Sequence, residues 1–202
     1  MALKEEMNLI SNISSGIVGI LLRNKIIDTS EKAVYQYGFE ILISSLITCI
    51  IAIAEGLAFK CLAASVIYFL IFAVLRTMCG GYHCQTYFRC NLVFSAVSAV
   101  VLSFYKFIPV ESFSKMHYTS ILLSLLITYF YSPIENKNKP LSEKQKKLSR
   151  IFGTLAVMAL SALACVLKIY YRSGYSTLID TTLLTVAITM FVAEPKKRVK
   201  PA

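Results

Sequence analysis

The sequence predicts an all-α, polytopic membrane protein with about six transmembrane helices and an N-terminal amphipathic helix at the membrane interface. Of its 202 residues, 56% are hydrophobic and only 16% are charged, and the mean hydropathy is +0.65. Ordinary soluble domains are less apolar than this. Apolar runs of roughly 18 or more residues are long enough to cross a bilayer, and the alternating pattern of membrane strands is absent.

The first 38 residues precede the first predicted span. Glu5 and Glu6 interrupt the basic start that a signal peptide needs, and no small-residue cleavage site follows. Apolar residues recur here at helical steps, at Leu3, Met7, Ile10, Ile17 and Leu21. This stripe favours a helix lying at the inner membrane surface. A helix packed into the bundle is the alternative.

Six apolar runs follow, and each predicts one membrane span. They cover residues 39–59, 61–78, 91–110, 116–132, 151–171 and 175–193. No internal repeat or low-complexity tract divides the chain. We therefore expect one integral-membrane domain over 1–202, with a cytoplasmic segment 1–38, a six-span bundle 39–193 and a basic cytoplasmic tail 194–202.

The formal net charge of +10 is distributed unevenly along the chain. Sixteen of the 21 Lys and Arg residues lie in 1–38, 76–90, 133–150 and 194–202, in alternation with the predicted spans. Positive residues concentrate on the cytoplasmic side of membrane proteins. Both termini and segment 76–90 are therefore predicted to face the cytoplasm of a bacterial cell. Because topology accounts for the charge, we expect no nucleic-acid partner.

Two carboxylates fall within predicted spans. Glu55 lies near the outer end of the first span, and Asp180 lies about two turns inside the last. Charges at such depth are rare and are often functional. Because both lie toward the outer side, we expect structural pairing or a water-filled cavity.

The reactive side chains gather in segment 76–90, RTMCGGYHCQTYFRC. The remaining cysteines, Cys49, Cys61 and Cys165, lie in or beside apolar spans and are expected to serve packing only. A disulfide framework is not expected in a reducing cytoplasm. Three interpretations of the segment remain, namely a zinc site, a capped helix end, and a cysteine nucleophile with a histidine base.

Ligand spacing and thiol chemistry distinguish between these three interpretations. The irregular spacing of Cys79, His83, Cys84 and Cys90 differs from the paired ligands of structural zinc sites. A capped helix end leaves the histidine unexplained. An imidazole beside a thiol populates the reactive thiolate, so we favour the nucleophile and expect neither metal nor cofactor.

Helical geometry leaves the identity of the nucleophile open. On a continuous helix, His83 and Cys90 would be about 10 Å apart along the axis. Cys79, four residues before His83, would be the better helical partner. A pair formed by His83 and Cys90 therefore requires a break in the helix, and Gly80-Gly81 predicts an irregular backbone just before His83.

The segment resembles the accessory gene regulator protein B family. The resemblance rests on the order Arg76, Gly80-Gly81-Tyr82-His83 and Cys90 between the second and third spans, and on the basic segment with Asn138-Lys139-Pro140-Leu141 after the fourth. It covers essentially the whole chain. It implies a membrane-embedded cysteine endopeptidase that processes a small, AgrD-like quorum-sensing peptide precursor, with His83 as general base and Cys90 as nucleophile. Cys84 stands where the family more often has a small residue.

The resemblance also implies a reaction. Cys90 would cleave the C-terminal tail from the precursor through an acyl-thioester, and a Cys or Ser of the precursor would then close a thiolactone or lactone. Such a site must exclude water and stabilise an oxyanion. Candidate oxyanion donors are Arg76, Gly80 and Gly81, and residues that could orient the histidine are Gln85, Thr86 and Glu40.

The basic segment after the fourth span is a candidate site for an acidic precursor tail. Its lysines are Lys137, Lys139, Lys144, Lys146 and Lys147. The alternative is that they only fix topology and contact anionic lipid. The expected partners are the precursor, the lipid bilayer and, as an option, a second copy of the chain. Alternative functions are a non-catalytic peptide transporter or scaffold and a metal-binding membrane sensor.

Overall fold

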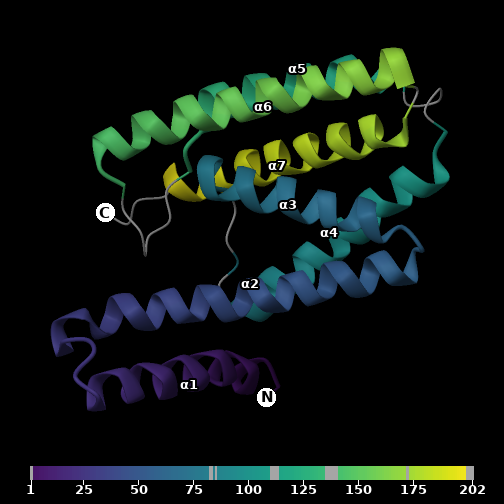
Figure 1. Cartoon of the computed structure of the whole chain (residues 1–202). Helices are drawn as coiled ribbons and strands as arrows, with labels where there is room; N and C mark the ends of the chain where they lie inside the picture. The colour runs from purple at the N-terminus through teal and green to yellow at the C-terminus, as the bar shows by residue number, and fades with distance from the viewer. Residues whose placement is uncertain are drawn as a thin grey trace. The chain divides into compact units, whose positions relative to one another are not determined.

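The computed structural model describes residues 2–81, 84, 86–109, 114–134, 141–171 and 173–198, with the backbone alone for 2–8, 114–115 and 194–198. Within these ranges the chain is helical, without a β-strand. The elements, labelled in Figure 1, are α1 (Ala2–Arg23), the 3-10 helix η1 (Thr29–Glu31), α2 (Lys32–Ala58), α3 (Leu62–Cys79), α4 (Tyr87–Phe107), α5 (Ser114–Tyr131), α6 (Glu143–Tyr171) and α7 (Gly174–Arg198).

Five of the helices in the described ranges, α2, α3, α4, α6 and α7, are long and apolar enough to cross a membrane. The predicted all-α, polytopic architecture is thereby confirmed. The remaining predicted span is present as α5 but is more polar. Its polar residues Ser120, Ser124 and Thr128 are buried, whereas Leu122 and Phe130 are exposed. The face of α5 that is exposed therefore remains compatible with lipid.

The helices extend beyond the apolar runs where capping residues start them earlier. Helix α6 begins at Glu143, well before the apolar run at 151. Ser142 Oγ accepts the Gln145 N–H at 3.3 Å, and Gln145 Oε1 accepts the Ser142 N–H at 2.9 Å. This reciprocal pair is a capping box, which satisfies backbone donors at a helix start. The apolar runs therefore indicate which part of each helix can cross the membrane, whereas the capping residues determine where the helix begins.

The described chain forms two compact units. The N-terminal unit comprises residues 1–52 and 84–96, and the C-terminal unit comprises residues 53–83 and 97–202. Helices α2 and α4 each contribute to both units. We describe each unit by itself.

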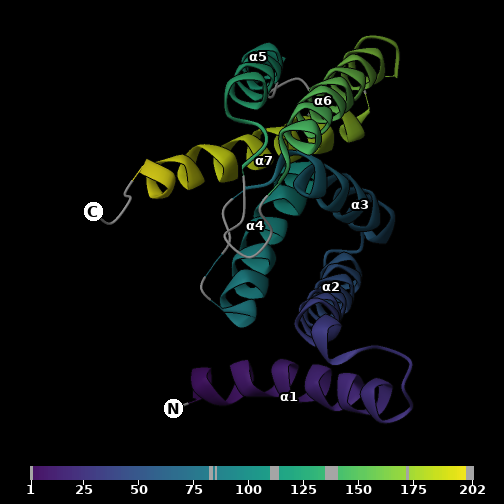
Figure 2. The ribbon, with the colours of Figure 1, turned by 90° about the vertical axis from the view of Figure 1, so that its left-hand side faces the viewer.

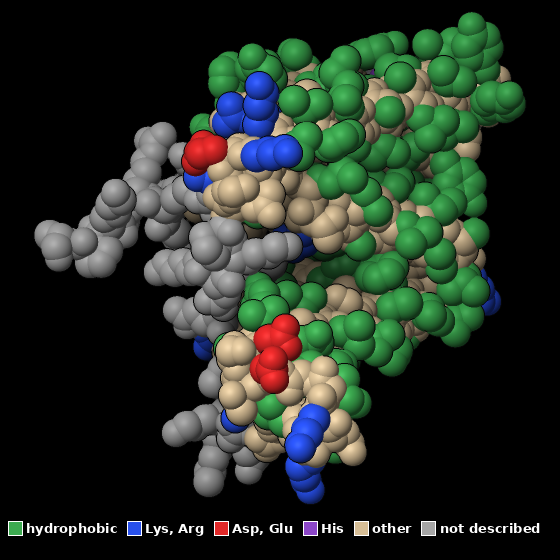
Figure 3. Space-filling model, turned by 60° about the vertical axis from the view of Figure 1, so that its left-hand side comes forward, with side chains coloured by type: hydrophobic (Ala, Val, Ile, Leu, Met, Phe, Trp, Pro, Cys, Tyr) green, Lys and Arg blue, Asp and Glu red, His purple; other side chains and the backbone are tan. Residues whose placement is uncertain are grey.

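Helix α7 is the centre of the C-terminal unit. In its apolar window 61% of the residues are buried, against at most 33% in the other four candidate spans. It packs against α3, α5 and α6, and Figure 2 shows these helices around it. Leu75, Val157, Leu183 and Met190 form part of the shared core. On the face that Figure 3 shows, hydrophobic side chains gather over much of the described helices, as lipid contact favours.

A buried polar cluster joins three helices of this unit. Asp180 Oδ2 lies 2.5 Å from His117 Nδ1, so the structural pairing expected for Asp180 is confirmed. Cys165 Sγ lies 3.5 Å from the other ring nitrogen, His117 Nε2. The expectation that Cys165 serves packing alone is therefore wrong. No sequence signal indicates this contact, because the two residues are 48 positions apart and lie on different helices.

Helix α1 shows the expected two-sided character. Ile10, Ser14 and Val18 are buried, and Ile17 and Leu21 on the same side are half-buried. The predicted helix is thus confirmed, and its place at the membrane surface stays a prediction.

Within the N-terminal unit, polar side chains connect α2 to α4. Asn91 Oδ1 accepts hydrogen bonds from Ser44 Oγ at 3.3 Å and from Thr48 Oγ1 at 3.1 Å. Helix α1 is connected to α2 by the Gln36 amide, which donates to Ser11 Oγ at 3.5 Å. Hydrogen bonds of this kind stabilise helix pairs in lipid, where water offers no competing partner.

Candidate functional site

The helix is interrupted between Cys79 and Cys90, as the pairing of His83 with Cys90 requires. Helix α3 ends at Cys79, and α4 begins at Tyr87. Gly80 and Gly81 have φ angles of +76° and +146°, which side chains with a Cβ rarely adopt. Three residues of the predicted site, Tyr82, His83 and Gln85, lie outside the described residues.

Gly80 ends α3 by a close backbone contact with the segment after α5. The Ile134 N–H donates to the Cys79 carbonyl at 2.9 Å, and a Cβ on Gly80 would lie 2.2 Å from the Ile134 carbonyl oxygen. The Gly80 N–H donates to the Arg76 carbonyl at 3.0 Å. Because this N–H terminates the helix, Gly81 is the better glycine candidate for an oxyanion donor.

Arg76 and Gly81 approach each other in the C-terminal unit. A Cβ on Gly81 would lie 3.3 Å from Arg76 Nη1 and 3.1 Å from Thr189 Oγ1. The Arg76 guanidinium also lies over the Phe72 ring, at 5.6 Å from its centroid. Two of the predicted oxyanion candidates are thus neighbours. Thr189 joins them from α7, and no sequence signal marks it.

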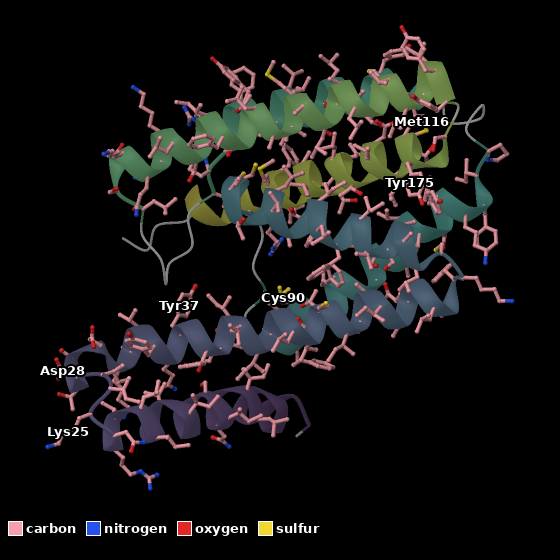
Figure 4. All side chains as sticks on the ribbon, viewed as in Figure 1. Lys25, Asp28, Tyr37, Cys90, Met116 and Tyr175 are labelled. Carbon is pink, nitrogen blue, oxygen red and sulfur yellow. The ribbon has the colours of Figure 1, made fainter. Side chains whose placement is uncertain are left out.

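Cys90 lies in the first turn of α4, in the N-terminal unit, and is half-buried. Its N–H donates to the Thr86 carbonyl at 3.1 Å. The Thr86 hydroxyl accepts the Arg89 N–H at 3.2 Å, so Thr86 is the N-cap of α4. A helix N-terminus favours negative charge, and a thiolate on Cys90 would benefit from it. Figure 4 labels Cys90 on this helix.

Glu40 on α2 is held beside the same turn of α4. The Tyr87 hydroxyl donates to Glu40 Oε2 at 3.0 Å. The next turn is fixed to α2 by Asn91, which the sequence analysis missed because a single amide in an apolar run has no distinctive spacing. Polar contacts therefore hold the helix start that carries Cys90.

The other cysteines of the segment differ in burial. Cys79 is completely buried in the core, where a Cβ added to Gly153 would lie 2.8 Å from its Sγ. A peptide cannot reach this thiol in the observed conformation. Cys84, like Cys90, is half-buried. In the part of the chain that the structure describes, no three His, Cys, Asp or Glu side chains are placed to hold a metal ion.

The basic residues proposed to bind a substrate tail lie partly on α6. Lys144 and Lys147 are exposed in its first two turns. Lys146 Nζ lies 2.8 Å from Glu143 Oε1. Arg150 Nε donates to the Ser132 carbonyl at 2.9 Å and so connects α6 to the end of α5. Lys137 and Lys139 lie outside the described residues.

The fold and this segment define a multi-pass helical membrane protein with a thiol at a helix start and a glycine-rich break before it. The family model of accessory gene regulator B (AgrB) matches residues 14–192. The chain therefore belongs to the AgrB family, which indicates a role in the agr quorum-sensing system.

Individual relatives agree with this assignment. An AgrB-like protein 2 from Clostridium perfringens (strain 13 / Type A) is 28% identical over 178 residues, which cover 83% of this chain and 82% of the relative. An AgrB-like protein from Clostridium perfringens (strain SM101 / Type A) is 26% identical, over 80% of this chain and 78% of the relative. One from Clostridium beijerinckii is 26% identical, over 76% and 73%. No solved structure matches.

Proposed function

We propose that this protein is a membrane-embedded cysteine endopeptidase that removes the C-terminal tail of an AgrD-like peptide precursor. The observation that supports it best is the break between α3 and α4, which ends one helix at Cys79 and starts the next just before Cys90. A continuous helix would separate His83 from Cys90 by about two turns. Membership in the AgrB family, from the match over residues 14–192, supports a role in the agr quorum-sensing system.

In the proposed reaction, His83 accepts the proton of the Cys90 thiol, and the sulfur attacks the carbonyl carbon of the scissile peptide bond. His83 then gives the proton to the leaving amine, and the tail departs. The remaining acyl-thioester is attacked by a Cys or Ser of the precursor, whose proton passes to His83 as the ring closes. His83 gives this proton to the departing sulfur, which regenerates the Cys90 thiol. Each proton and each leaving group is thus accounted for without a cofactor.

The negative oxygen that forms during each attack needs a donor. The Arg76 guanidinium and the Gly81 N–H are the candidates, because the structure brings them together and engages the Gly80 N–H elsewhere. Exchange between thioesters is nearly balanced in free energy, so exclusion of water and loss of the tail decide whether the ring accumulates.

The proposal also specifies the side of the membrane on which the site lies and how the precursor tail is bound. Positive residues predict that the site and both termini face the cytoplasm. The precursor tail is proposed to be acidic and to meet the lysines at the start of α6, with a second copy of the chain as an optional partner.

The test is mass spectrometry of a candidate precursor co-expressed with the full chain. Cys90→Ala and His83→Ala should both abolish cleavage. The loss in Cys90→Ala should exceed the roughly 10²–10⁴-fold effect of removing an acid–base group alone, because the covalent route itself disappears with the thiol. Cys49→Ala and Cys61→Ala are matched controls that should cleave normally. Cleavage that persists in Cys90→Ala would assign the nucleophile to Cys84 and contradict the proposal.

A further inference from the structure

A second cysteine–histidine pair lies in the C-terminal unit, at the end opposite to Cys79. His117 is near the start of α5, Cys165 near the end of α6, and Asp180 in the second turn of α7. Cys165 is about 18 Å along α6 from Gly153, the residue that packs on Cys79. Met116 and Tyr175, labelled in Figure 4, mark this end of the unit.

The two hydrogen bonds of His117 fix which nitrogen can accept a proton. Asp180 Oδ2 lies 2.5 Å from Nδ1, and a carboxylate there accepts the Nδ1–H. The lone pair of a neutral ring is then on Nε2, which lies 3.5 Å from Cys165 Sγ. A thiol, an imidazole and an orienting carboxylate in this order form the arrangement that activates a nucleophile in cysteine hydrolases.

Burial separates the roles of the three side chains. His117 and Asp180 are buried, with exposed fractions of 0% and 1%, whereas Cys165 is half-buried. Of the three residues, only Cys165 is therefore partly accessible to another molecule. Lys168, one turn beyond on α6, interacts electrostatically with both Cys165 and Asp180.

A purely structural ion pair would explain only part of this cluster. Such a pair would account for the contact between α5 and α7. It would not account for the Cys165 thiol beside His117 Nε2, the ring nitrogen that does not contact Asp180.

We propose that Cys165 is a second nucleophilic thiol of this protein, with His117 as its base and Asp180 as the residue that positions His117, and that it accepts acyl groups from small thioesters. The thiol proton moves to His117 Nε2 while the sulfur attacks the thioester carbonyl. The bond from that carbon to the leaving sulfur then breaks, and the leaving thiolate takes the proton from His117. No oxidant, metal or water is consumed.

The choice of a thioester rests on the proposed function, because Cys90 chemistry would generate acyl-thioesters and thiolactones in the same membrane. The nucleophilic character of Cys165 is independent of it. The positive-inside pattern predicts Cys165 toward the outer side of the membrane and Cys90 toward the cytoplasm, so the two thiols would act on opposite sides of it.

The first test measures alkylation of each cysteine in the full chain by N-ethylmaleimide, with mass spectrometry to locate the adduct. Cys61, a half-buried thiol at the start of α3, is the internal control. At pH 7, Cys165 should react at least about tenfold faster than Cys61, because only a thiolate reacts. Asp180→Asn and His117→Gln should remove this difference. Equal rates in the unmodified chain would overturn the proposal.

The pH dependence separates activation from a structural role and needs no variant. The titratable side chains that face the cluster in the described residues are Lys168 on α6 and Tyr118 on α5, besides Asp180 on α7. Cys165 alkylation should begin at a lower pH than Cys61 alkylation in the same chain, because an imidazolium on His117 stabilises the thiolate. Coincident pH profiles of the two thiols in the unmodified chain would show a structural pair only.

The substrate class is tested with a soluble N-acetylglycine benzyl thioester and the Cys90→Ala chain. Acylation of Cys165 should still occur there and should be lost in Cys90→Ala/His117→Gln. No acylation despite fast alkylation would contradict the thioester class. Loss of precursor cleavage in Cys90→Ala concerns only the proposed function, so the two failures are distinguishable.

Discussion

At the scale of single residues, Gly80 and Gly81 perform different tasks although they are adjacent. Gly80 has no room for a side chain, because the Ile134 carbonyl approaches its Cα. Gly81 faces Arg76 and Thr189, which are polar. One glycine therefore closes the end of α3 against the segment after α5, and the next leaves its backbone beside a guanidinium.

Substitution of these glycines gives the first prediction. Gly80→Ala should destabilise the protein by roughly 2–4 kcal/mol, because a Cβ is disfavoured at positive φ and would meet backbone atoms that cannot move aside. Gly38→Ala is the control, since its Cβ would meet nothing within 4 Å on α2. Thermal unfolding of both purified variants in detergent measures the difference. Equal unfolding temperatures would contradict the close contact.

The sequence could predict the residue types of the site but not all of their roles. The Gly-Gly pair indicated an irregular backbone, and the break in the helix is present. That the Gly80 N–H ends α3, and that Thr86 caps α4, depends on where each helix stops, which composition does not determine. The contact of His117, Cys165 and Asp180 was beyond prediction because these residues lie on three different helices.

At the scale of helices, polar residues decide where the apolar elements begin and which faces meet. The apolar runs predicted the spans, since length and hydropathy reflect the bilayer directly. The run for α5 was short because one face of this helix carries small hydroxyl residues buried against its neighbours. Helix α6 extends into the basic segment because the Ser142–Gln145 capping box begins it there.

The capping box gives the second prediction. Ser142→Ala should destabilise the first turn of α6 by about 1 kcal/mol, since Gln145 loses its side-chain acceptor. Lys144, Lys146 and Lys147 increase the need for a cap, because positive charge at a helix N-terminus opposes the helix dipole. Hydrogen exchange of residues 143–147 measures this effect. Ser142→Asp retains an acceptor and should exchange like the unmodified chain, whereas slow exchange in Ser142→Ala would argue against the cap.

The bond between α2 and α4 gives a third prediction. Asn91→Ala should cost roughly 0.6–1.7 kcal/mol, the range of interhelical hydrogen bonds in lipid. Because Ser44 and Thr48 both donate to Asn91, the cost should be non-additive with Ser44→Ala or Thr48→Val. A double-mutant cycle in chemical unfolding measures the coupling. Strictly additive losses in the free energy of unfolding would show that the two hydroxyls are not coupled to Asn91.

At the scale of the whole molecule, the direction in which the chain crosses the membrane decides where each thiol acts. Helix α6 has 29 residues, about 43 Å of helix, and therefore exceeds the roughly 30 Å hydrocarbon core. Its ends should emerge on opposite sides. Composition predicts which side is which, because sixteen of 21 basic residues alternate with the spans.

Two cysteines introduced on this one helix test the orientation. Tyr171→Cys, at an exposed position at the end of α6, should react with a membrane-impermeant maleimide applied to intact cells. Lys144→Cys, exposed near the start of the same helix, should react only after the membrane is permeabilised. The unmodified chain shows the background from native cysteines. The reverse pattern would place Cys90 outside the cell and invalidate the cytoplasmic orientation.

The proposed capture of an acidic precursor tail belongs to the same scale, because it joins the start of α6 to the reaction of Cys90. Single surface ion pairs contribute only about 0–1 kcal/mol, and Lys146 is already paired with Glu143. Recognition would therefore need several lysines together and should weaken as salt rises. Single Lys→Ala changes are expected to have little effect.

Reversal of Lys144, Lys146 and Lys147 to glutamate should raise KM for the precursor by about tenfold or more, since three pairs become repulsive. The kcat should change less, because none of these lysines takes part in the proposed proton transfer. Precursor processing at several concentrations separates the two constants, with Lys60→Glu at the predicted outer turn as control. A precursor with a basic tail should restore cleavage by the triple variant, since the charges are then complementary again. If the triple variant inserts correctly and processes a precursor with an acidic tail at the normal rate, capture of the tail by these lysines is wrong. Their charges would then serve only to fix the topology.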